Sequence, residues 1–178
     1  MTDIQLVFVP DARLKKASEA VDASEFGEEL EKHMNNMLNK MYELNGVGLA
    51  GVQAGDMRRL LVADPGTGAI MLVNPEVVEK SEETVSYEEG CLSLPGFQLK
   101  VERNENIKVK YKTPLGEEVE KEFFGIEAVV VQHEMDHLDG ITLLNKVSKL
   151  KRDIYLRKIK KFKRRIKRRI KQRTQAYY

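Results

Sequence analysis

The chain has 178 residues, of which 42% are hydrophobic and 33% are charged, as is typical of a soluble globular protein. No apolar run approaches the ~18 residues of a membrane span. We expect neither a secretion signal nor an acid-poor transit peptide at the N-terminus. A single cysteine, Cys91, excludes an internal disulfide framework and favours an intracellular, cytoplasmic location. The net charge of +2 divides unevenly: residues 146–178 contain 16 Lys and Arg against one acid (net +15), whereas residues 1–145 contain 14 against 27 (net −13), which indicates two separate tasks.

The first predicted elements are a strand, a helix and a glycine-rich loop. Residues 4–9 (IQLVFV) predict a short strand closed by Pro10. Residues 22–43 predict a helix that begins with Asp22 and Glu25 as a capping pair, because apolar residues recur at spacings of three and four: Phe26, Leu30, Met34, Met37, Leu38 and Met41. His33, next to this stripe, is expected to be structural or on the surface. The loop is 46-GVGLAGVQAG-55.

Strands and two further helices are predicted after the loop. The runs 59-RLLVAD-64 and 69-AIMLVN-74 flank the turn 65-PGTG-68, and the second run stops before Pro75. Residues 99–124 predict a hairpin-like region in which 107-IKVKY-111 alternates with period two and 113-TPLG-116 forms the turn. Residues 125–138 and about 148–173 have helical periodicity. We therefore expect an α+β fold, with antiparallel strands around a central helix in a domain of residues 1–148, and a basic amphipathic C-terminal helix in residues 149–178.

The predicted central helix ends in 132-QHEMDHLDG-140, which contains two candidate metal ligands. Residues four apart on a helix share a face, so His133 and His137 point the same way and Glu134 lies beside them. In this HExxH arrangement the imidazoles bind a divalent metal and the carboxylate handles protons for water. The same five residues can also arise by chance on a charged helix, and two ligands do not make a stable site.

A third ligand is not found where HExxH proteases have one. One group requires a histidine where this chain has Leu143, and another takes a carboxylate from a later helix, where the only acid is Asp153. Cys91 is the remaining soft ligand, at the bend 90-GCLSLPG-96. A free cysteine is most often a small buried hydrophobe, but a thiolate on a bend can reach a metal.

Three segments together resemble the signature motifs of peptide deformylases: 46-GVGLAGVQ-53, 89-EGCLS-93 and 133-HEMDH-137. They occur in the order and at the approximate spacing of that family, and the resemblance covers roughly residues 5–150. One departure is Gly51, where the family usually has a second alanine. The resemblance implies a hydrolase that removes the N-formyl group from the N-terminal formyl-methionine of nascent polypeptides and releases formate.

The same resemblance implies a role for each motif residue. Cys91, His133 and His137 would bind the metal, which is ferrous iron in the cell in that family and can be replaced by zinc, nickel or cobalt. Glu134 would be the general acid–base, and the oxyanion donors would be the Gln53 side chain and the main-chain N–H of Leu92. Glu89 would pair with Arg103 and brace the Cys91 bend. The substrate peptide would lie along 46-GVGL-49 as an added strand, and the expected substrate-binding residues are Val47, Gly48, Tyr87, Gly90, Ile126, Val129 and Val130.

The basic C-terminal helix keeps one narrow apolar stripe among its charges: Leu150, Ile154, Ile159, Phe162, Ile166 and Ile170. Sixteen like charges favour nucleic acid or another acidic surface as the partner. Because deformylases act on chains that leave the ribosome, and the C-terminal helix of bacterial deformylases is associated with ribosome docking, we expect this helix to bind the ribosome. Other RNA and the surface of an anionic membrane remain alternatives, without stable membrane insertion.

Two other functions are consistent with parts of the sequence. One is a metallopeptidase of the HExxH kind, which the missing third protease ligand and 89-EGCLS-93 disfavour. The other is an inactive deformylase-like protein that binds the ribosome or RNA, which the complete set of motif residues disfavours.

Overall fold

The computed structural model describes residues 4–175, except for the side chains of residue 163 and of residues 166–175. The chain divides into two compact units, Met1–Thr142 and Leu143–Tyr178, and each is described by itself. The domain boundary that we expected between residues 148 and 149 stays a prediction.

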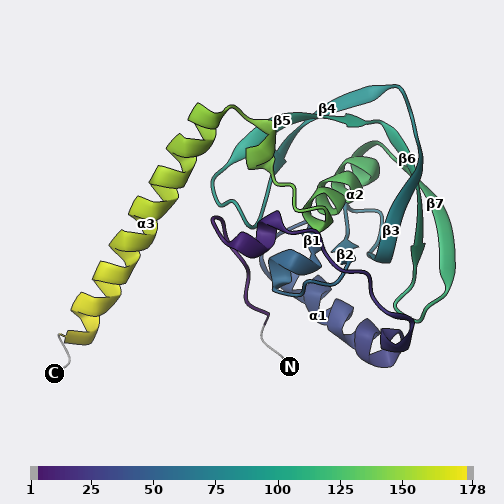
Figure 1. Cartoon of the computed structure of the whole chain (residues 1–178), viewed down its shortest axis with the longest axis horizontal. Coiled ribbons are helices and arrows are strands. Elements are labelled where there is room, and N and C mark those ends of the chain that lie inside the picture. Colours follow the sequence, from purple (N-terminus) through teal and green to yellow (C-terminus); the bar gives the residue numbers. More distant parts are fainter. Residues whose placement is uncertain (1–3, 176–178) are drawn as a thin grey trace. The chain divides into compact units, whose positions relative to one another are not determined.

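The first unit is built from antiparallel strands that curve around one helix (Figure 1). Five strands form a sheet in the order β1-β2-β3-β6-β7, and their bounds are Gly48–Ala50, Leu60–Ala63, Ile70–Lys80, Asn106–Lys112 and Glu118–Phe124. A separate two-stranded sheet contains β4 (Thr84–Gly90) and β5 (Gln98–Asn104). The helices are α1 (Glu28–Glu43) and α2 (Gly125–Leu138). The predicted α+β fold with antiparallel strands around the HExxH helix is confirmed.

Helix α2 is the predicted central helix, and its bounds are those expected from the sequence. Gly125 has φ +53°, which lets the chain turn directly from β7 into the helix. Buried residues occur all round α2, as expected of a helix enclosed by strands; they are Ala128, Val129, Val130, Val131, His133, Glu134, Met135, His137 and Leu138. At the other end, the N–H of Ser18 donates to the carbonyl of Leu138 at 2.7 Å and satisfies one of the last carbonyls.

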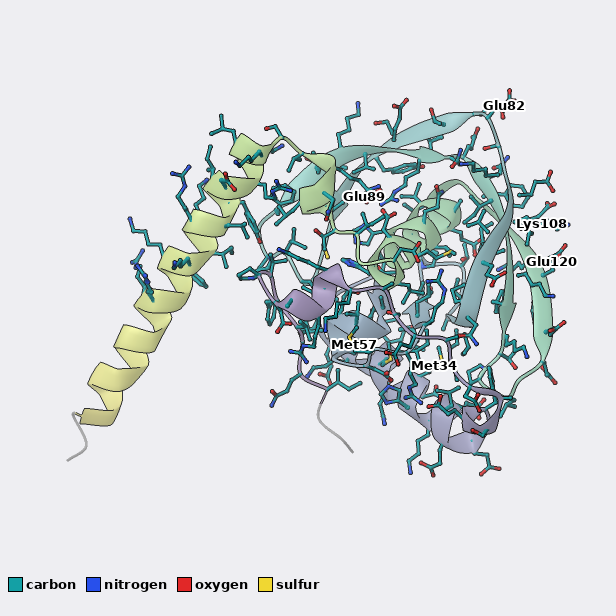
Figure 2. All side chains as sticks on the ribbon, in the orientation of Figure 1. Met34, Met57, Glu82, Glu89, Lys108 and Glu120 are labelled. Atoms are coloured by element: carbon teal, nitrogen blue, oxygen red, sulfur yellow. The ribbon has the colours of Figure 1, made fainter. Side chains whose placement is uncertain are left out.

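Helix α1 buries the predicted apolar stripe from Leu30 to Met41, which joins one core cluster with Leu49, Leu60, Val62 and Val73 of the sheet. Phe26, the first residue of the predicted stripe, lies before the helix and is half-buried against the same cluster. Met34, at the centre of the stripe, is fully buried (Figure 2). The helix begins at Glu28 and not at residue 22, because Gly27 has φ +137° and interrupts the helical backbone. Asp22 and Glu25 do form a capping box, but it caps the short 3₁₀ turn Ala23–Glu25.

Three strand predictions need correction. Residues 4–9 form no strand: the N–H groups of Val7 and Val9 donate to Gln53 and Ser93, which belong to different segments, so no ladder forms. Strand β3 continues through Pro75 to Lys80, because the register with β6 shifts between Val73 and Glu76 and Pro75 sits in this irregularity. Strand β4 was not predicted, since most of its residues are polar and exposed.

Strands β6 and β7 form the predicted hairpin across 113-TPLG-116. Lysines on β6 lie opposite glutamates on β7. Lys108 Nζ, for example, lies 2.7 Å from Glu120 Oε1 (Figure 2). Such exposed pairs contribute little to stability. Because each lysine of β6 faces a glutamate of β7, these pairs add no net charge to this unit.

His33 has a structural contact with a partly buried carboxylate. Asp56 Oδ2 lies 2.9 Å from His33 Nε2 and 2.7 Å from Arg58 Nη2. Burial raises the pKa of Asp56, but hydrogen bonds from His33 and Arg58 outweigh it and hold that pKa well below its usual value. A carboxylate with a depressed folded-state pKa stabilises the fold above its unfolded-state pKa of about 3.9, and this contribution is lost as the pH falls below that value.

Asp56→Asn is therefore expected to lower the free energy of unfolding at pH 7 by about 1–3 kcal/mol, the worth of hydrogen bonds to a charged group. Urea titrations at pH 7 and pH 3 measure the difference between variant and wild type. We expect a smaller difference at pH 3, where part of the wild-type contribution is already lost. An equal difference at both pH values would contradict the assignment.

The second unit contains the 3₁₀ turn Leu143–Lys146 and helix α3 (Lys149–Gln175), which confirms the predicted basic helix. Of the predicted apolar stripe, Leu150, Ile154 and Phe162 are exposed and Ile159 is half-buried. Ile166 and Ile170 lie outside the residues whose side chains are described. None of the helices in residues 4–175 has the length and apolar character needed to cross a membrane.

Candidate metal centre

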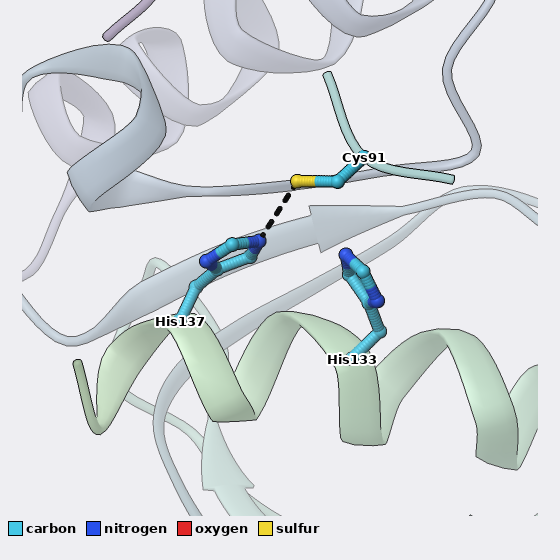
Figure 3. A group of neighbouring side chains, drawn as sticks. All are labelled: Cys91, His133 and His137. Carbon is cyan, nitrogen blue, oxygen red and sulfur yellow. Dashed lines mark hydrogen bonds between the residues drawn. The ribbon is translucent and has the colours of Figure 1, made fainter. Parts of the chain in front are cut away.

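Three side chains from two elements converge on one point (Figure 3). Helix α2 directs His133 and His137 from the same face, and Cys91 follows β4 at a bend closed by the Leu94 N–H on the Cys91 carbonyl. One ligand atom of each residue lies within 4.8 Å of the others, and Cys91 Sγ is 3.2 Å from His137 Nε2. Two imidazoles and a thiolate suit divalent metals such as Zn(II) and Fe(II), so these residues fit the expected metal.

A buried ion-pair network orients the first histidine. His133 Nδ1 lies 2.7 Å from Glu89 Oε2, and because a carboxylate only accepts, Nδ1 carries the proton and Nε2 is left for a metal. Arg103 donates two hydrogen bonds to Glu89, at 2.7 and 2.9 Å, and a third to Asp136 at 2.6 Å. Burial raises the pKa of Glu89, but the bonds from Arg103 and His133 outweigh it and lower that pKa to about 2. The predicted pairing of Glu89 with Arg103 is confirmed.

Glu89→Gln is expected to lower the affinity of the centre for a divalent metal about 10–100-fold, the usual cost of losing the partner of a metal-binding histidine. The neutral amide is a weaker acceptor for the Nδ1 proton and leaves Arg103 partly unpaired. Competition with a chelator measures the affinity. Glu88→Gln is the matched control, because Glu88 is the neighbouring residue on β4 and is exposed. Equal affinity of the Glu89 variant and wild type would show that Glu89 does not orient His133.

Glu134 lies next to this cluster and is buried. In the described part of the chain its Oε2 atom has no hydrogen-bond partner. Burial raises the pKa of Glu134 to about 7, although the charge of His133 acts in the opposite direction. Strand β1 packs directly on this side chain: a Cβ at Gly48 would contact Glu134 Oε1 and come within 2.8 Å of its Cδ atom. Only glycine at position 48 leaves room for the carboxylate.

Gln53 and Leu92 present N–H groups near the cysteine. The Oε1 atom of Gln53 accepts a 2.7 Å bond from the N–H of Ala50, which turns the Nε2 atom toward Cys91 Sγ at 3.5 Å. Among the residues that the structure describes, no acceptor lies within hydrogen-bond reach of the Leu92 main-chain N–H. Both donors are therefore available to a group bound beside Cys91.

These residues border a cavity of about 370 Å³. All the sequence-predicted site residues line it except His137, which is buried. Its apolar wall contains the buried Val129 and Val130, with the more exposed Val47, Tyr87 and Ile126 toward solvent. The predicted residues that line it are Val47, Gly48, Gln53, Tyr87, Gly90, Cys91, Leu92, Ile126, Val129, Val130, His133 and Glu134.

Two lining residues were not predicted individually, Asn45 and Glu88. Asn45 has φ +54°, a left-handed conformation that asparagine tolerates, and its position just before the first glycine of the loop could have indicated it. Glu88 is one of several acids on β4, and nothing in the sequence distinguishes it from the others.

The chain is similar to known proteins over most of its length. The family described as Polypeptide deformylase matches residues 4–153. A peptide deformylase of Thermodesulfovibrio yellowstonii is 42% identical over 165 residues, which are 90% of this chain and 98% of the relative. The peptide deformylase structure from Ehrlichia chaffeensis is 34% identical with a TM-score of 0.85, and covers 92% of this chain and 98% of that one. A class I type b peptide deformylase structure from Acinetobacter baumannii, with Met-Ala-Ser bound, is 36% identical with a TM-score of 0.78, over 83% of this chain and 100% of that one.

Proposed function

This chain belongs to the polypeptide deformylase family, and from that premise we propose how its own residues carry out the reaction. The enzyme hydrolyses the N-formyl group of the N-terminal formyl-methionine of nascent polypeptides and releases formate. The observation that carries the proposed site is the convergence of Cys91, His133 and His137 beside the buried carboxyl group of Glu134.

We propose that Cys91, His133 and His137 hold one divalent metal, with ferrous iron as the ion in the cell and zinc, nickel or cobalt as replacements. When bound, such a metal makes water a better nucleophile at neutral pH and polarises a carbonyl group. Glu134 accepts a proton from the attacking water and delivers it to the leaving amine. Its position supports this role, because the carboxyl group borders the cavity and one of its oxygens has no partner among the described residues.

Gln53 and Leu92 are the proposed oxyanion donors. Attack of water on the formyl carbon creates a negative oxygen, which is stabilised by N–H groups already aimed at it. The Gln53 amide is held by the Ala50 N–H and needs no rearrangement to donate. The Leu92 N–H follows Cys91 directly, so both donors act on the same side of the centre.

The proposed substrate site combines a strand edge with an apolar pocket. Strand β1 is an end strand of its sheet, so a peptide can add beside 46-GVGL-49 through main-chain hydrogen bonds that tolerate any sequence. Gly90 and Tyr87 of β4 border the same cavity, and Ile126, Val129 and Val130 would surround the methionine side chain. The related Acinetobacter structure with Met-Ala-Ser bound supports a methionine-first peptide as the occupant.

A formate-release assay tests the function. The protein is loaded with iron under anaerobic conditions and given formyl-Met-Ala-Ser, with acetyl-Met-Ala-Ser as the matched control. We expect a much higher kcat/KM for the formyl peptide, because the centre and the two donors leave room for hydrogen but little for a methyl group. Comparable hydrolysis of both peptides would contradict the proposed site, and a higher kcat/KM with zinc or cobalt than with iron would contradict iron as the preferred ion.

We further propose that α3 binds the ribosome and that residues 149–178 act as a separate docking segment. The support is chemical: the described side chains of α3 carry exposed Lys and Arg beside exposed Leu150, Ile154 and Phe162, and the substrate emerges from a surface rich in rRNA phosphate. This role places the enzyme in the cytoplasm, where nascent chains are made. Other RNA or an anionic membrane would be the partner if ribosome binding fails.

Replacing the exposed residues Lys160, Lys161, Arg164 and Arg165 by glutamine is expected to weaken ribosome binding and leave activity on short peptides unchanged. Phosphate contacts release counterions, so binding should also weaken with salt, with a slope of log K against log[salt] of about −0.7 to −0.9 for each contact. Co-sedimentation with ribosomes and with anionic vesicles across a salt series measures this. Glutamine at Lys108, Lys110 and Lys112 of β6, of which Lys110 is exposed and the other two are half-buried, is the control. Equal ribosome binding by wild type and the α3 variant would remove the docking role.

A further inference from the structure

The proposed metal ligands come from two parts of the fold that are far apart in the chain. His133 and His137 lie on α2, whereas Cys91 follows β4, which pairs only with β5 and is outside the five-stranded sheet. The β4–β5 pair is regular from Thr84 opposite Asn104 to Gly90 opposite Gln98. The distance from Cys91 to the histidines depends on the contacts of the bend itself, such as the Val9 N–H on the Ser93 carbonyl, and on how this strand pair is attached to α2.

Three side-chain links attach the strand pair to α2 among the described residues. Two are charged, Glu89 to His133 and Arg103 to Asp136. The third is neutral and is made by Gln132. Its Oε1 atom accepts a 3.2 Å bond from the Asn104 N–H, and its Nε2 atom donates a 2.8 Å bond to the Asn104 carbonyl and a 3.0 Å bond to Ala128 within the helix.

The Gln132 amide thus satisfies both the N–H and the carbonyl of Asn104, as the main chain of a neighbouring strand would. The side chain of Asn104 in turn donates to the Ser81 carbonyl at 2.8 Å, at the end of β3. Asn104 is therefore one point at which the strand pair is joined both to α2 and to the end of β3. Gln132 itself does not line the cavity and, among the described residues, bonds to none of the proposed metal ligands.

The link between Gln132 and Asn104 lies at the opposite end of the strand pair from Cys91. The two ends of β5 are roughly 20 Å apart at about 3.4 Å per residue, and Gly90, beside Cys91, pairs with the far end of β5. The Glu89–His133 bond holds the end of the strand pair near Cys91, and the Gln132 bonds hold the other end. The two links together set the orientation of the strand pair on α2, and with it the position of the thiolate. Metal–ligand distances tolerate only about 0.2 Å.

We propose that Gln132 is a positioning residue: by clamping the Asn104 main chain to α2 it fixes Cys91 relative to His133 and His137, and so sets the thiolate–metal distance. This inference rests on the proposed metal site. It concerns a residue outside the three ligands and outside the Glu89 network.

The test uses the full-length protein with Co(II) as the probe, because a cobalt–thiolate bond has a charge-transfer absorption band that reports the bond directly. Gln132→Met keeps the size of the side chain and removes both bonds to Asn104. We expect a weaker charge-transfer band, Co(II) affinity lower by about 10–100-fold, and a lower kcat with little change in KM for formyl-Met-Ala-Ser.

Asn74→Gly is the matched control for a merely structural effect. The Asn74 amide makes the same kind of two-bond clamp, to the N–H and carbonyl of Val21 at 2.8 and 2.9 Å, but away from the centre. Glycine tolerates the φ of +52° at this position. This variant should have a lower Tm and an unchanged cobalt spectrum.

An unchanged charge-transfer band and unchanged Co(II) affinity in Gln132→Met would overturn the proposal. So would an equal spectral change in Asn74→Gly. If Gln132→Met does not fold, Gln132→Glu is measured in its place, because it keeps an acceptor for the Asn104 N–H but loses the donor to the Asn104 carbonyl. An unchanged cobalt spectrum of Gln132→Glu would also overturn the proposal. A wild-type protein without any thiolate band would instead refute the metal site itself, so the two failures are distinguishable.

Discussion

Glu134→Gln is expected to lower kcat for formyl-Met-Ala-Ser about 10²–10⁴-fold, the range that a general acid–base group contributes. Glutamine has nearly the same size and fits the enclosed position beside Gly48, where there is no space for a larger side chain. Its amide cannot accept a proton from water and cannot return one to the leaving amine. Measurement of kcat and KM should show the loss in kcat, because the change leaves the apolar pocket intact.

Two further measurements decide the interpretation of this variant. Metal content and Tm are expected to match those of the wild type, since Glu134 is not one of the three proposed ligands. Glu127→Gln is the matched control: Glu127 is on the same helix, but its carboxylate accepts a 2.6 Å bond from Thr67 and does not line the cavity. Near-normal turnover of Glu134→Gln would remove it as the base, and an equal loss in Glu127→Gln would show that the effect is not specific.

Cys91→Ala is expected to abolish turnover by releasing the metal. It removes one of three protein ligands, so the affinity should fall by more than the roughly 10–100-fold that loss of an outer partner costs. The substitution keeps Cβ and removes only the sulfur atom, and the bend at Cys91 is held by its own main-chain bond from Leu94. The variant should therefore fold, and metal analysis after gel filtration should find it largely empty.

Ser93→Ala is the matched control for the cysteine variant. Ser93 is in the same bend and is buried, and its hydroxyl has no partner in the described part of the chain. This variant should keep its metal and its activity. Removal of metal from wild type with a chelator should abolish activity reversibly, whereas added metal should not restore Cys91→Ala. Full metal occupancy and normal activity in Cys91→Ala would refute the ligand assignment.

Elements with strong local patterns were predicted correctly. Helix α2 has the predicted bounds, and the buried stripe of α1 is the one that its spacing indicated. The errors occurred where long-range contacts overrode local pattern. Residues 4–9 have the apolar composition of a strand, but their bonding partners belong to two different segments. Strand β4 has few apolar residues and is ordered by pairing with β5 over its whole length.

Within the site, the sequence by itself determined the pairing of His133 with His137 and the place of Glu134 beside them. These follow from helix geometry, in which each residue's direction depends only on its spacing from its neighbours. The resemblance to peptide deformylases also implied Cys91 as the third ligand and Gln53 as a donor. Both belong to segments far from α2 in the chain, so the sequence alone could not give their distances.

Only the tertiary structure decided the contacts that orient and support the side chains of the centre. The Nδ1 atom of His133 faces Glu89, Gly48 packs on Glu134, and the main chain at Asn104 is clamped by Gln132. Each of these contacts joins residues at least 28 positions apart. Periodicity and turn preference act over a few residues, whereas such distances depend on how β1, the β4–β5 pair and α2 pack together, and packing is a property of the whole enclosed core.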